Sequence, residues 1–440
     1  MRSMFSGVSG LKAHQAKMDV IGNNIANVNT VGFKSGRVTF KEVFSQTIKG
    51  SGGADSATAR AGTNPMQIGL GVGVSSIDTI MTRGSSERTD NPTDLSIEGD
   101  GFFILKGSTS DTYKFTRAGN FAIDELGNLN LSGKNVCGWE YDEATKSFDT
   151  SSPVKGINLY RDYASGKNKQ ILAAQPTTQA YIGGNLDSTT ATAETFNVPM
   201  VVYDALGNEY KSQMIFTKVA PVQSGTTSRT TWNLTTTGTI KDAKDNDITK
   251  LVAIDPTTAS VTFDENGMYV PPATATDIKL NITPADAMGT TLFGVKLNLS
   301  SLTMFSSDSS AKPTDVNGYP PGTLTTFNVG TDGIITGIYS NGEQQALGMV
   351  GVTTFANPGG LTKVGENLFI PSTNSGDYSN GVAPGTTGAG SLNPGTLEMS
   401  NVDLSKEFTD MIITQRGFQA NSRIITTSDE MLQELVNLKR

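Results

Sequence analysis

Apolar residues recur every seven positions at both ends of this chain. In each end segment a second set of positions, which starts at Val8 in one and at Phe408 in the other, is largely polar or small. This pattern predicts two amphipathic helices, each with one apolar stripe that a partner must bury. The stripes, which we call the assembly seam, consist of Met4, Leu11, Met18 and Ile25 at the N-terminal end and of Leu404, Met411, Phe418, Ile425 and Leu432 at the C-terminal end.

The C-terminal helix is expected to run from about Leu404 to Val436, a length of roughly 50 Å at 1.5 Å per residue. Ser400, followed three positions later by Asp403, resembles a capping box before this helix. The two helices can pair side by side in a coiled-coil-like module. Ordinary amphipathic helices of a protein core remain the alternative interpretation.

Three glycines, Gly7, Gly10 and Gly22, interrupt the N-terminal helix. Each destabilises a helix by roughly 0.5–1 kcal/mol relative to alanine, so this helix is expected to need a partner. Helices that form only when their stripes are buried would be mobile in a monomer and ordered in a polymer.

Between the two ends, the pattern is that of strands and tight turns. Alternating apolar and polar residues flank three similar segments, DELGN at 124–128, DALGN at 204–208 and DENG at 264–267. Residues 226–239 are rich in threonine, which favours strands. Recurrent hairpins predict antiparallel β-domains, so the fold class is mixed and mainly β.

Glycine-rich stretches at residues 50–53 and 374–390 flank the β-region and suggest its boundaries. A chain that leaves one helix and returns to a second makes the β-domains insertions in a helical pair. We therefore predict a terminal helical module at 1–30 and 400–440, a linker region at 31–70, a first β-domain at 71–150 and 318–399, and a nested outer β-domain at 151–317.

Composition narrows the function classes. Only 17% of the 440 residues are charged and 48 are glycine, which indicates turn-rich domains with neutral polar surfaces. The net charge of −8 comes without a cluster of Lys and Arg, so we expect no nucleic acid partner and no membrane insertion.

The lone Cys137 predicts a buried small hydrophobe, with an intersubunit covalent link as the alternative. The first residues lack the apolar core of a cleaved signal peptide.

The candidates for chemistry are few. His14 is the only histidine and lies within a predicted helix, so histidine-based catalytic and metal sites have little to draw on. Ser9 and Lys12 match a serine–lysine spacing by chance on that helix, and the glycines of residues 69–73 indicate a flexible joint. Four acidic residues could supply the paired carboxylates of a glycosidase-like site, but they fall in turns, where acidic residues are common: Asp90, Asp94, Glu98 and Asp100. We expect no enzyme, no catalytic, cofactor-binding or metal site, and no cofactor.

Several segments resemble the flagellar axial family of rod, hook and hook-associated proteins. The terminal matches are SGVSGL at 6–11, DVIGNNIANVNT at 19–30, GFK at 32–34, SNVDLS at 400–405, QRGFQANS at 415–422 and LVNL at 435–438. Internal matches, which resemble the hook members of the family, are NPTDLSI at 91–97, GFF at 101–103, FTRAGNF at 115–121 and GYPPG at 318–322. Phe418 departs from the family pattern, in which tyrosine is common at this position.

The resemblance implies a structural subunit that self-assembles into a curved tubular helical polymer, the hook, and transmits motor torque to the filament. It implies that the paired helices line an inner tube and the β-domains form outer layers. Implied partners are further copies of the chain, other axial proteins at the rod and filament junctions, the type III export apparatus and a hook-cap scaffold. The implied location is the extracellular flagellum, reached without a cleaved signal peptide. A distal rod or hook-associated protein is one alternative, and a secreted adhesin or carbohydrate-binding module is another.

Overall fold

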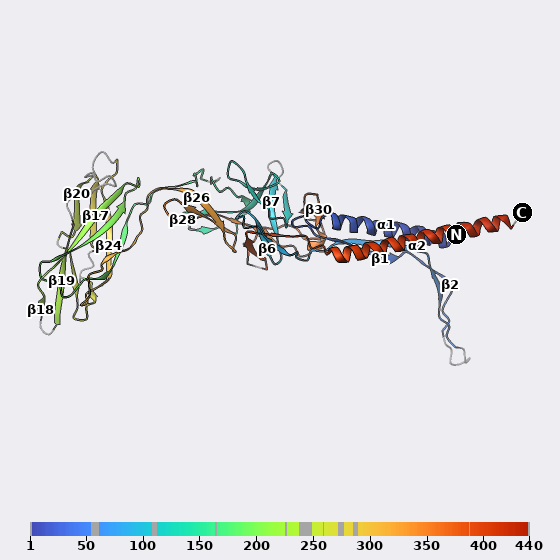
Figure 1. The fold of residues 1–440 in the computed structure, drawn as a ribbon, viewed down its shortest axis with the longest axis horizontal. Helices are drawn as coiled ribbons and strands as arrows, with labels where there is room; N and C mark the ends of the chain where they lie inside the picture. The colour runs from blue at the N-terminus through green and yellow to red at the C-terminus, as the bar shows by residue number, and fades with distance from the viewer. Residues whose placement is uncertain are drawn as a thin grey trace. The chain divides into compact units, whose positions relative to one another are not determined.

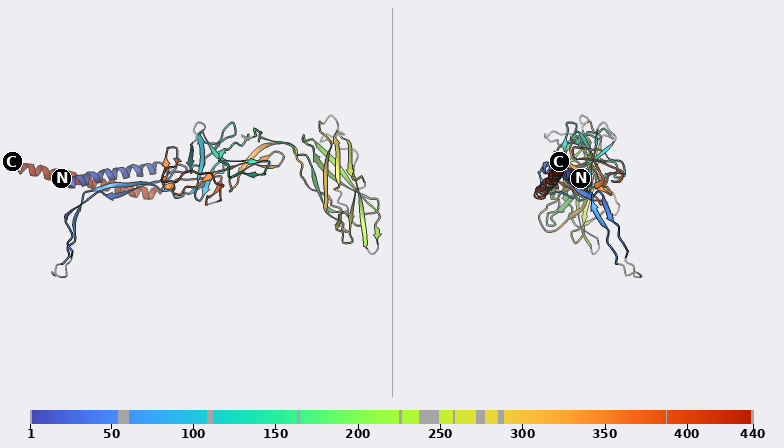
Figure 2. Two further views of the ribbon diagram at one scale, coloured as in Figure 1. Left: turned by 180° about the vertical axis from the view of Figure 1, so that it is seen from behind. Right: turned by 90° about the vertical axis from the view of Figure 1, so that its right-hand side faces the viewer.

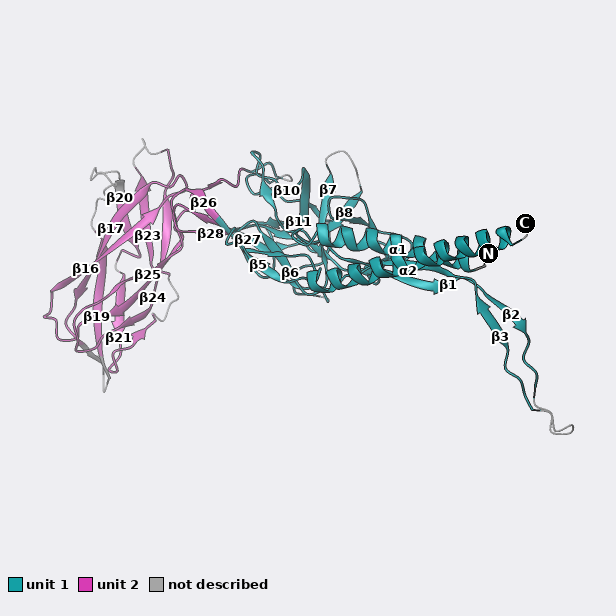
Figure 3. Ribbon diagram, turned by 45° about the vertical axis from the view of Figure 1, so that its right-hand side comes forward, with its two compact units in different colours: residues 1–167, 327–336, 346–440 teal, residues 168–326, 337–345 magenta. Residues whose placement is uncertain are grey.

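The structure is a computed structural model of the 440-residue chain. It describes residues 2–53, 61–107, 112–162, 165–224, 227–236, 249–257, 259–271, 277–284, 289–386 and 388–438. The chain forms two compact units, one of residues 1–167, 327–336 and 346–440 and one of residues 168–326 and 337–345, coloured separately in Figure 3. The predicted fold class is confirmed, because a helix forms each end of a chain that otherwise consists mainly of strands (Figure 1).

The first unit contains both helices and most of the short strands. Its elements are α1 (Arg2–Ala26), β1 (Gly36–Glu42), β2 (Ser45–Lys49), β3 (Met66–Gly69), β4 (Val72–Thr79), β5 (Ser86–Arg88), β6 (Leu95–Glu98), β7 (Phe102–Gly107), β8 (Tyr113–Thr116), β9 (Ala122–Ile123), β10 (Leu129–Leu131), β11 (Lys134–Asp142), β12 (Ser147–Phe148), β13 (Lys155–Gly156), β29 (Val352–Thr353), the 3-10 helix η2 (Pro358–Gly360), β30 (Thr362–Lys363), β31 (Leu368–Ile370), β32 (Ser391–Pro394), β33 (Thr396–Glu398) and α2 (Leu404–Asn437). Three strands have residues in both units: β26 (Gly322–Val329), β27 (Ile334–Tyr339) and β28 (Gln344–Val350).

The central sheet of the first unit orders its strands β28-β11-β7-β8-β31-β30. Its core contains Phe102, Phe115, Trp139 and Phe369, all of them buried. Two further antiparallel pairs, β6 with β32 and β5 with β33, join the N-terminal part of this unit to the segment that leads into α2. The chain therefore closes this unit from both of its ends.

The second unit is built from two sheets that share one large core. Its strands are β14 (Ile171–Leu172), β15 (Gln179–Asn185), β16 (Thr195–Tyr203), β17 (Glu209–Lys218), β18 (Val222–Ser224), β19 (Thr227–Thr236), β20 (Thr249–Asp255), β21 (Ser260–Phe263), β22 (Tyr269–Val270), β23 (Lys279–Pro284), β24 (Phe293–Thr303) and β25 (Lys312–Val316). One sheet orders its strands β20-β23-β24-β15-β25, and the other β16-β17-β19-β21-β22. The strict alternation of buried and exposed residues along β16 and β17 shows why one face of a sheet enters this core.

The three predicted turns are confirmed. The carboxylate of Asp124 accepts hydrogen bonds from the backbone and the side-chain amide of Asn128, both at 2.7 Å, and Asp204 accepts the equivalent pair from Asn208 at 2.8 Å. In the third turn Asp264 accepts from the backbone of Asn266 and Met268. The threonine-rich stretch also forms a strand, β19, while Thr226 and residues 237–239 lie outside the described residues.

Helix α2 occupies the predicted range, but its cap differs from the predicted capping box. Asp403 is the N-cap residue, and its carboxylate accepts hydrogen bonds from the backbone of Ser405 and Lys406. Ser400 lies before the cap, where its hydroxyl oxygen accepts a hydrogen bond from the backbone N–H of Val402. The cap is therefore a single aspartate, which satisfies backbone donors at the start of the helix.

The segment predicted as a linker, residues 31–70, contains strands. Strand β1 pairs antiparallel with β4, and β2 pairs antiparallel with β3. The β2–β3 hairpin, with Val43 and Phe44 leading into it, is called the arm below; it stands away from the rest of the first unit in both views of Figure 2. The second unit begins at residue 168, so residues 151–167, which we predicted as part of the outer domain, belong to the first unit.

Candidate functional site

The two terminal helices lie side by side and antiparallel (Figure 1). Three hydrogen-bonded or ion-paired contacts fix their register: Ser3 with Ser428 at 3.4 Å, Lys17 with Asp410 at 3.0 Å and Asn24 with Glu407 at 3.1 Å. Residue numbers thus increase along α1 in the direction in which they decrease along α2. The predicted pairing of the terminal helices is confirmed, and the structure adds its direction.

Small residues lie at the contact between the helices. A Cβ atom added to Gly7 would lie 3.2 Å from the side chain of Ile425, and one added to Gly10 would lie 2.8 Å from the side-chain amide of Asn421. On the facing helix, a Cβ atom added to Gly417 would lie 2.7 Å from the ring of His14. The glycines that weaken α1 as an isolated helix therefore let the two backbones approach closely. Gly22, by contrast, has nothing within 4 Å of such an atom.

Two ionisable groups at this contact have shifted pKa values. Burial, and to a lesser extent the charge of Lys17, lowers the pKa of His14, whose Nδ1 is buried without a hydrogen-bond partner in the described structure. Burial also raises the pKa of Glu407, and the nearby Asp410 acts in the same direction. Both shifts favour the neutral form, as expected for groups that lie partly between two helices.

The structure leaves all nine residues of the assembly seam at least partly exposed. None of them is buried: seven are partly exposed, and Leu404 and Leu432 are exposed. Of these nine, Ile425 makes the described close approach to the facing helix, at Gly7. The buried positions of α1 are instead Gly7, Gly10, Ala13, Ile21 and Asn24. Part of the surface of every seam residue is thus accessible to other molecules.

Further apolar side chains, which the heptad pattern did not single out, are exposed on both helices. Ile413, Ile424, Met431 and Leu435 of α2, with Leu438 at its C-cap, recur at spacings of eleven, seven, four and three, so they share one stripe. Phe5 and Val8 are exposed on α1. A search for spacings of eleven residues in the sequence would have found the α2 stripe.

Three buried charged side chains, Lys34, Arg117 and Glu398, form what we call the junction cluster. The cluster joins the segments that follow α1 and precede α2 to the β-structure. Lys34, just after α1, donates to Glu398 at 2.6 Å, and Arg117 donates to the other carboxylate oxygen of Glu398 at 3.2 Å. The side chains are 1%, 5% and 1% exposed for Lys34, Arg117 and Glu398. Burial lowers the pKa of both cationic groups, while the charge of Glu398 opposes that shift. Two cations thus depend on one carboxylate, which ties both helix-proximal segments to the β-structure.

The candidate catalytic residues occupy structural positions. Asp94 accepts a hydrogen bond from Thr89, and Glu98 pairs with Arg83 on the surface. The Ser9 hydroxyl donates to the backbone oxygen of Ser6 and accepts from the backbone of Val72, at the close approach of Gly71.

Among the described residues, no group of three or more His, Cys, Asp or Glu side chains could hold a metal ion. No described helix has both the length and the apolar character needed to cross a bilayer.

Cys137 lies in β11 and is 0% exposed. Burial raises the pKa of its thiol to about 12. Because a thiolate is the nucleophile in disulfide formation and alkylation, a buried thiol with this pKa is inert. The structure thus favours the buried hydrophobe over the intersubunit link.

We expect Cys137 to resist thiol reagents in the native protein. At pH 8, Ellman's reagent should release less than about a tenth of a thiol equivalent before denaturant is added and one full equivalent afterwards, since burial blocks access and disfavours the thiolate. Rapid labelling of the native chain would contradict this expectation, with a Cys137→Ser variant as the blank.

Comparison with known proteins identifies relatives along the whole chain. Residues 4–34 match the family described as flagella basal body rod protein, residues 168–319 the flagellar basal body protein FlaE D2 domain, and residues 393–438 the flagellar basal body rod FlgEFG protein C-terminal. The terminal matches cover both helices. The match over residues 168–319 falls within the second unit, whose fold the sequence patterns described least.

Individual relatives extend these matches over full lengths. The chain is 38% identical to the flagellar hook protein FlgE of Treponema pallidum and 38% identical to that of Borreliella burgdorferi, in both cases over 100% of each chain. It is 33% identical to the flagellar basal-body rod protein FlgG of Bacillus subtilis, again over 100% of each chain. The crystal structure of the Helicobacter pylori flagellar hook protein FlgE2 superposes with a TM-score of 0.50 at 14% identity, over 71% of this chain and 100% of that one, which supports the fold.

Proposed function

This chain belongs to the flagellar rod and hook protein family, and we propose that copies of it assemble through the seam on its paired terminal helices. It is a structural subunit of the flagellar hook. Self-polymerisation and contacts with other axial proteins of the flagellum follow from that family. The proposal concerns which surface carries this assembly.

The observation that carries the proposal is the uneven use of the helix surfaces. The described close approaches within the pair involve glycines, polar side chains and one seam residue, Ile425, while all nine seam residues stay at least partly exposed. Exposed apolar stripes of this length are typical of surfaces that become buried against another protein. In a polymer, seam residues such as Leu11 and Phe418 pack against neighbouring copies.

The family also supports a finer account of the polymer's role. In this proposal the hook is a curved tube that bends while it transmits motor torque, and the chain acts mechanically and not as an enzyme. It reaches the outside of the cell through the flagellar export apparatus, without a cleaved signal peptide, and is added beneath a hook-cap scaffold. The resemblance of the terminal segments to axial proteins supports each of these statements.

Charged substitutions in the seam test the proposal. We expect Leu11→Asp and Phe418→Asp to abolish polymers at concentrations at which the wild-type chain assembles, because each would bury a carboxylate without a partner. Electron microscopy and sedimentation measure the polymer, and near-ultraviolet circular dichroism checks that the aromatic side chains of the β-domains keep their native packing.

The matched controls are Gln15→Asp and Gln415→Asp, which add the same charge at exposed positions outside the apolar seam of the same helices. They should assemble like the wild type. Normal polymers from the two seam variants would refute the role of the seam, and a wild-type chain that never assembles would refute self-assembly itself.

A further inference from the structure

The arm is a two-stranded hairpin with one apolar face that the described structure leaves uncovered. Strand register places Gln46 opposite Ile68, and the backbone N–H of Leu70 donates to the oxygen of Phe44 at 2.8 Å. Side chains alternate along a strand, and the register shifts once, between Thr47 and Lys49. One face of the arm therefore carries four apolar side chains and one amide: Phe44, Ile48, Met66 and Ile68, with Gln46 among them. The opposite face carries polar residues, among them Thr47, which accepts a hydrogen bond from Gln67 at 3.0 Å.

All four apolar side chains of this face are exposed, with Phe44 at 71%. Every residue of β2 and β3 is exposed as well. An isolated two-stranded hairpin is at best marginally stable in water, and stability requires packing of its apolar face. The arm therefore has the properties of an element that becomes covered in the assembled state.

The C-terminal end of α2 presents a surface of matching character. The described contacts of α2 with α1 end at Ser428, and α2 continues to Asn437 past the N-terminal end of α1 (Figure 1). A pocket opens at this point, lined by Ser3, Arg423, Ile424, Thr427, Ser428 and Met431. Leu435, 62% exposed, extends the apolar surface beyond the pocket. The name terminal pocket is used below for the pocket together with the α2 surface from Ile424 to Leu435.

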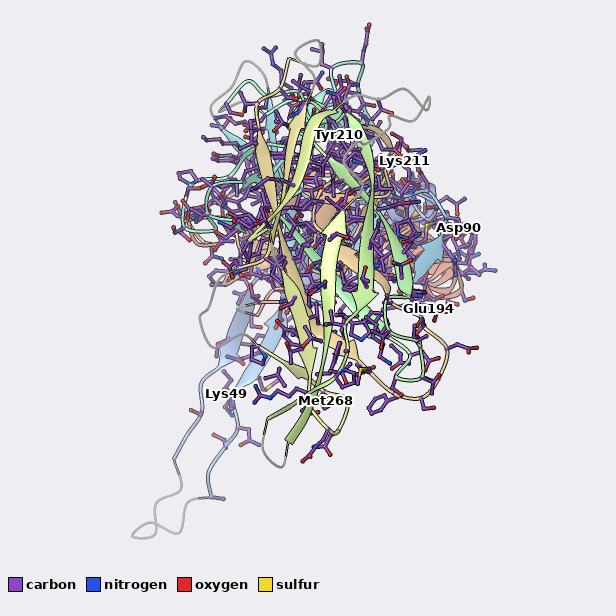
Figure 4. All side chains as sticks on the ribbon, turned by 90° about the vertical axis from the view of Figure 1, so that its left-hand side faces the viewer. Lys49, Asp90, Glu194, Tyr210, Lys211 and Met268 are labelled. Carbon is purple, nitrogen blue, oxygen red and sulfur yellow. The ribbon has the colours of Figure 1, made fainter. Side chains whose placement is uncertain are left out.

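Charge also favours this pairing. Arg423, which lines the pocket, is basic, while the charged residues between Ile424 and Leu438 are Asp429, Glu430 and Glu434, all acidic and all exposed. Acidic groups therefore outnumber basic ones on this surface. On the arm, Lys49 of β2 is exposed. Figure 4 labels it on the hairpin, away from most other side chains. A basic group on one surface and acidic groups on the other steer association and select its orientation.

We propose that the apolar face of the arm docks in the terminal pocket of a second copy of this chain, with Phe44 against Ile424 and Met431. This proposal rests on the proposed function, because it requires copies to meet in a polymer. It adds a contact separate from the assembly seam. Each copy then offers one arm and one terminal pocket, so the contact is head-to-tail and repeats without limit along a helical polymer.

Site-specific cross-linking tests the contact directly. The sole native cysteine, Cys137, is buried, so introduced cysteines can be oxidised without interference. Phe44→Cys chains and Met431→Cys chains are each mixed in minor amounts with excess wild-type chain, assembled together and oxidised. We expect disulfide-linked dimers in the polymer fraction, at least about tenfold above the level in the unassembled fraction, because packing holds the two positions together.

The matched control pairs Thr47→Cys with Met431→Cys, since Thr47 lies on the opposite face of the same hairpin. Suppose that both mixtures assemble while the Phe44→Cys and Met431→Cys mixture gives no more dimer than the Thr47→Cys and Met431→Cys mixture. That result overturns the arm contact and does not affect the proposal for the seam. A wild-type chain that fails to assemble overturns the proposed function as well.

A charge exchange provides a second measurement. Lys49→Glu and Glu434→Lys should each raise the critical concentration for assembly several-fold, and the double variant should return to within about twofold of the wild type. A pairing of Lys49 with Glu434 is contradicted if the single variants assemble like the wild type, or if the effects of the two single variants simply add in the double variant.

Discussion

Replacing Glu398 with glutamine is expected to lower the free energy of unfolding of the first unit by about 3–5 kcal/mol. The carboxylate of Glu398 contacts the buried Lys34 and the buried Arg117. Without it, two cations remain in a protein interior with no anion between them, and removal of one partner from a buried ion pair has a cost of this size. Glutamine keeps the shape of the side chain, so the loss reports the charge.

The measurement uses the two tryptophans, since Trp139 lies in the first unit and Trp232 in the second. In a Trp232→Phe background, urea unfolding followed by fluorescence reports the first unit alone. The control is Glu98→Gln, which removes an exposed partner of Arg83 and should cost less than about 1 kcal/mol.

Lys34→Met should cost less than Glu398→Gln, because it leaves one cation paired with one carboxylate. A Glu398→Gln variant as stable as the control would show that Glu398 does not hold the cluster together. Since Lys34 and Glu398 flank the two helices, a loss at this cluster should also raise the critical concentration for assembly.

Replacing Gly10 with leucine is expected to abolish assembly, although glycine is about 0.8–1 kcal/mol less favourable than alanine in a helix and leucine ranks just below alanine. A Cβ atom at this position would lie 2.8 Å from the side-chain amide of Asn421, and a leucine side chain needs still more room. The helices would separate, and with them the surfaces that each presents to other copies. We expect no polymer at ten times the wild-type critical concentration.

Gly22→Leu is the matched control, because it gives the same gain in helix propensity where nothing lies within 4 Å of a Cβ atom. This variant should assemble normally. Gly417→Leu, which would approach the ring of His14 from the facing helix, should fail like Gly10→Leu. Assembly of both contact variants would show that close approach of the two helices is not required.

Local sequence patterns predicted the elements whose causes are local. The heptad spacing predicted two terminal helices, and the range expected for the second, from about Leu404 to Val436, agrees with α2. The three Asp-containing turns were predicted because an aspartate and a glycine a few residues apart fix the backbone between them. The terminal signatures predicted the family, which the relatives confirm. The assignment of the seam to intersubunit contacts stays a prediction.

Strands in the 31–70 segment were missed because their pairing is set by distant residues. β1 pairs with β4, which lies beyond the glycine-rich stretch, and a composition rich in glycine and serine concealed the alternation in β2 and β3. Burial also separated residues that look alike in sequence. Asp94 accepts a hydrogen bond in a turn and Glu98 lies at the surface, although both were candidates for the same carboxylate chemistry.

The sequence by itself determined where the helices and turns form and to which family the chain belongs, because these depend on residues within a few positions of one another. The tertiary structure alone decided which helix faces meet and which charges are buried together. Lys34 and Glu398 are 364 positions apart, and Arg117 and Glu398 are 281 positions apart. No local pattern specifies such a contact, since it exists only after the sheets have brought both ends of the chain to one place.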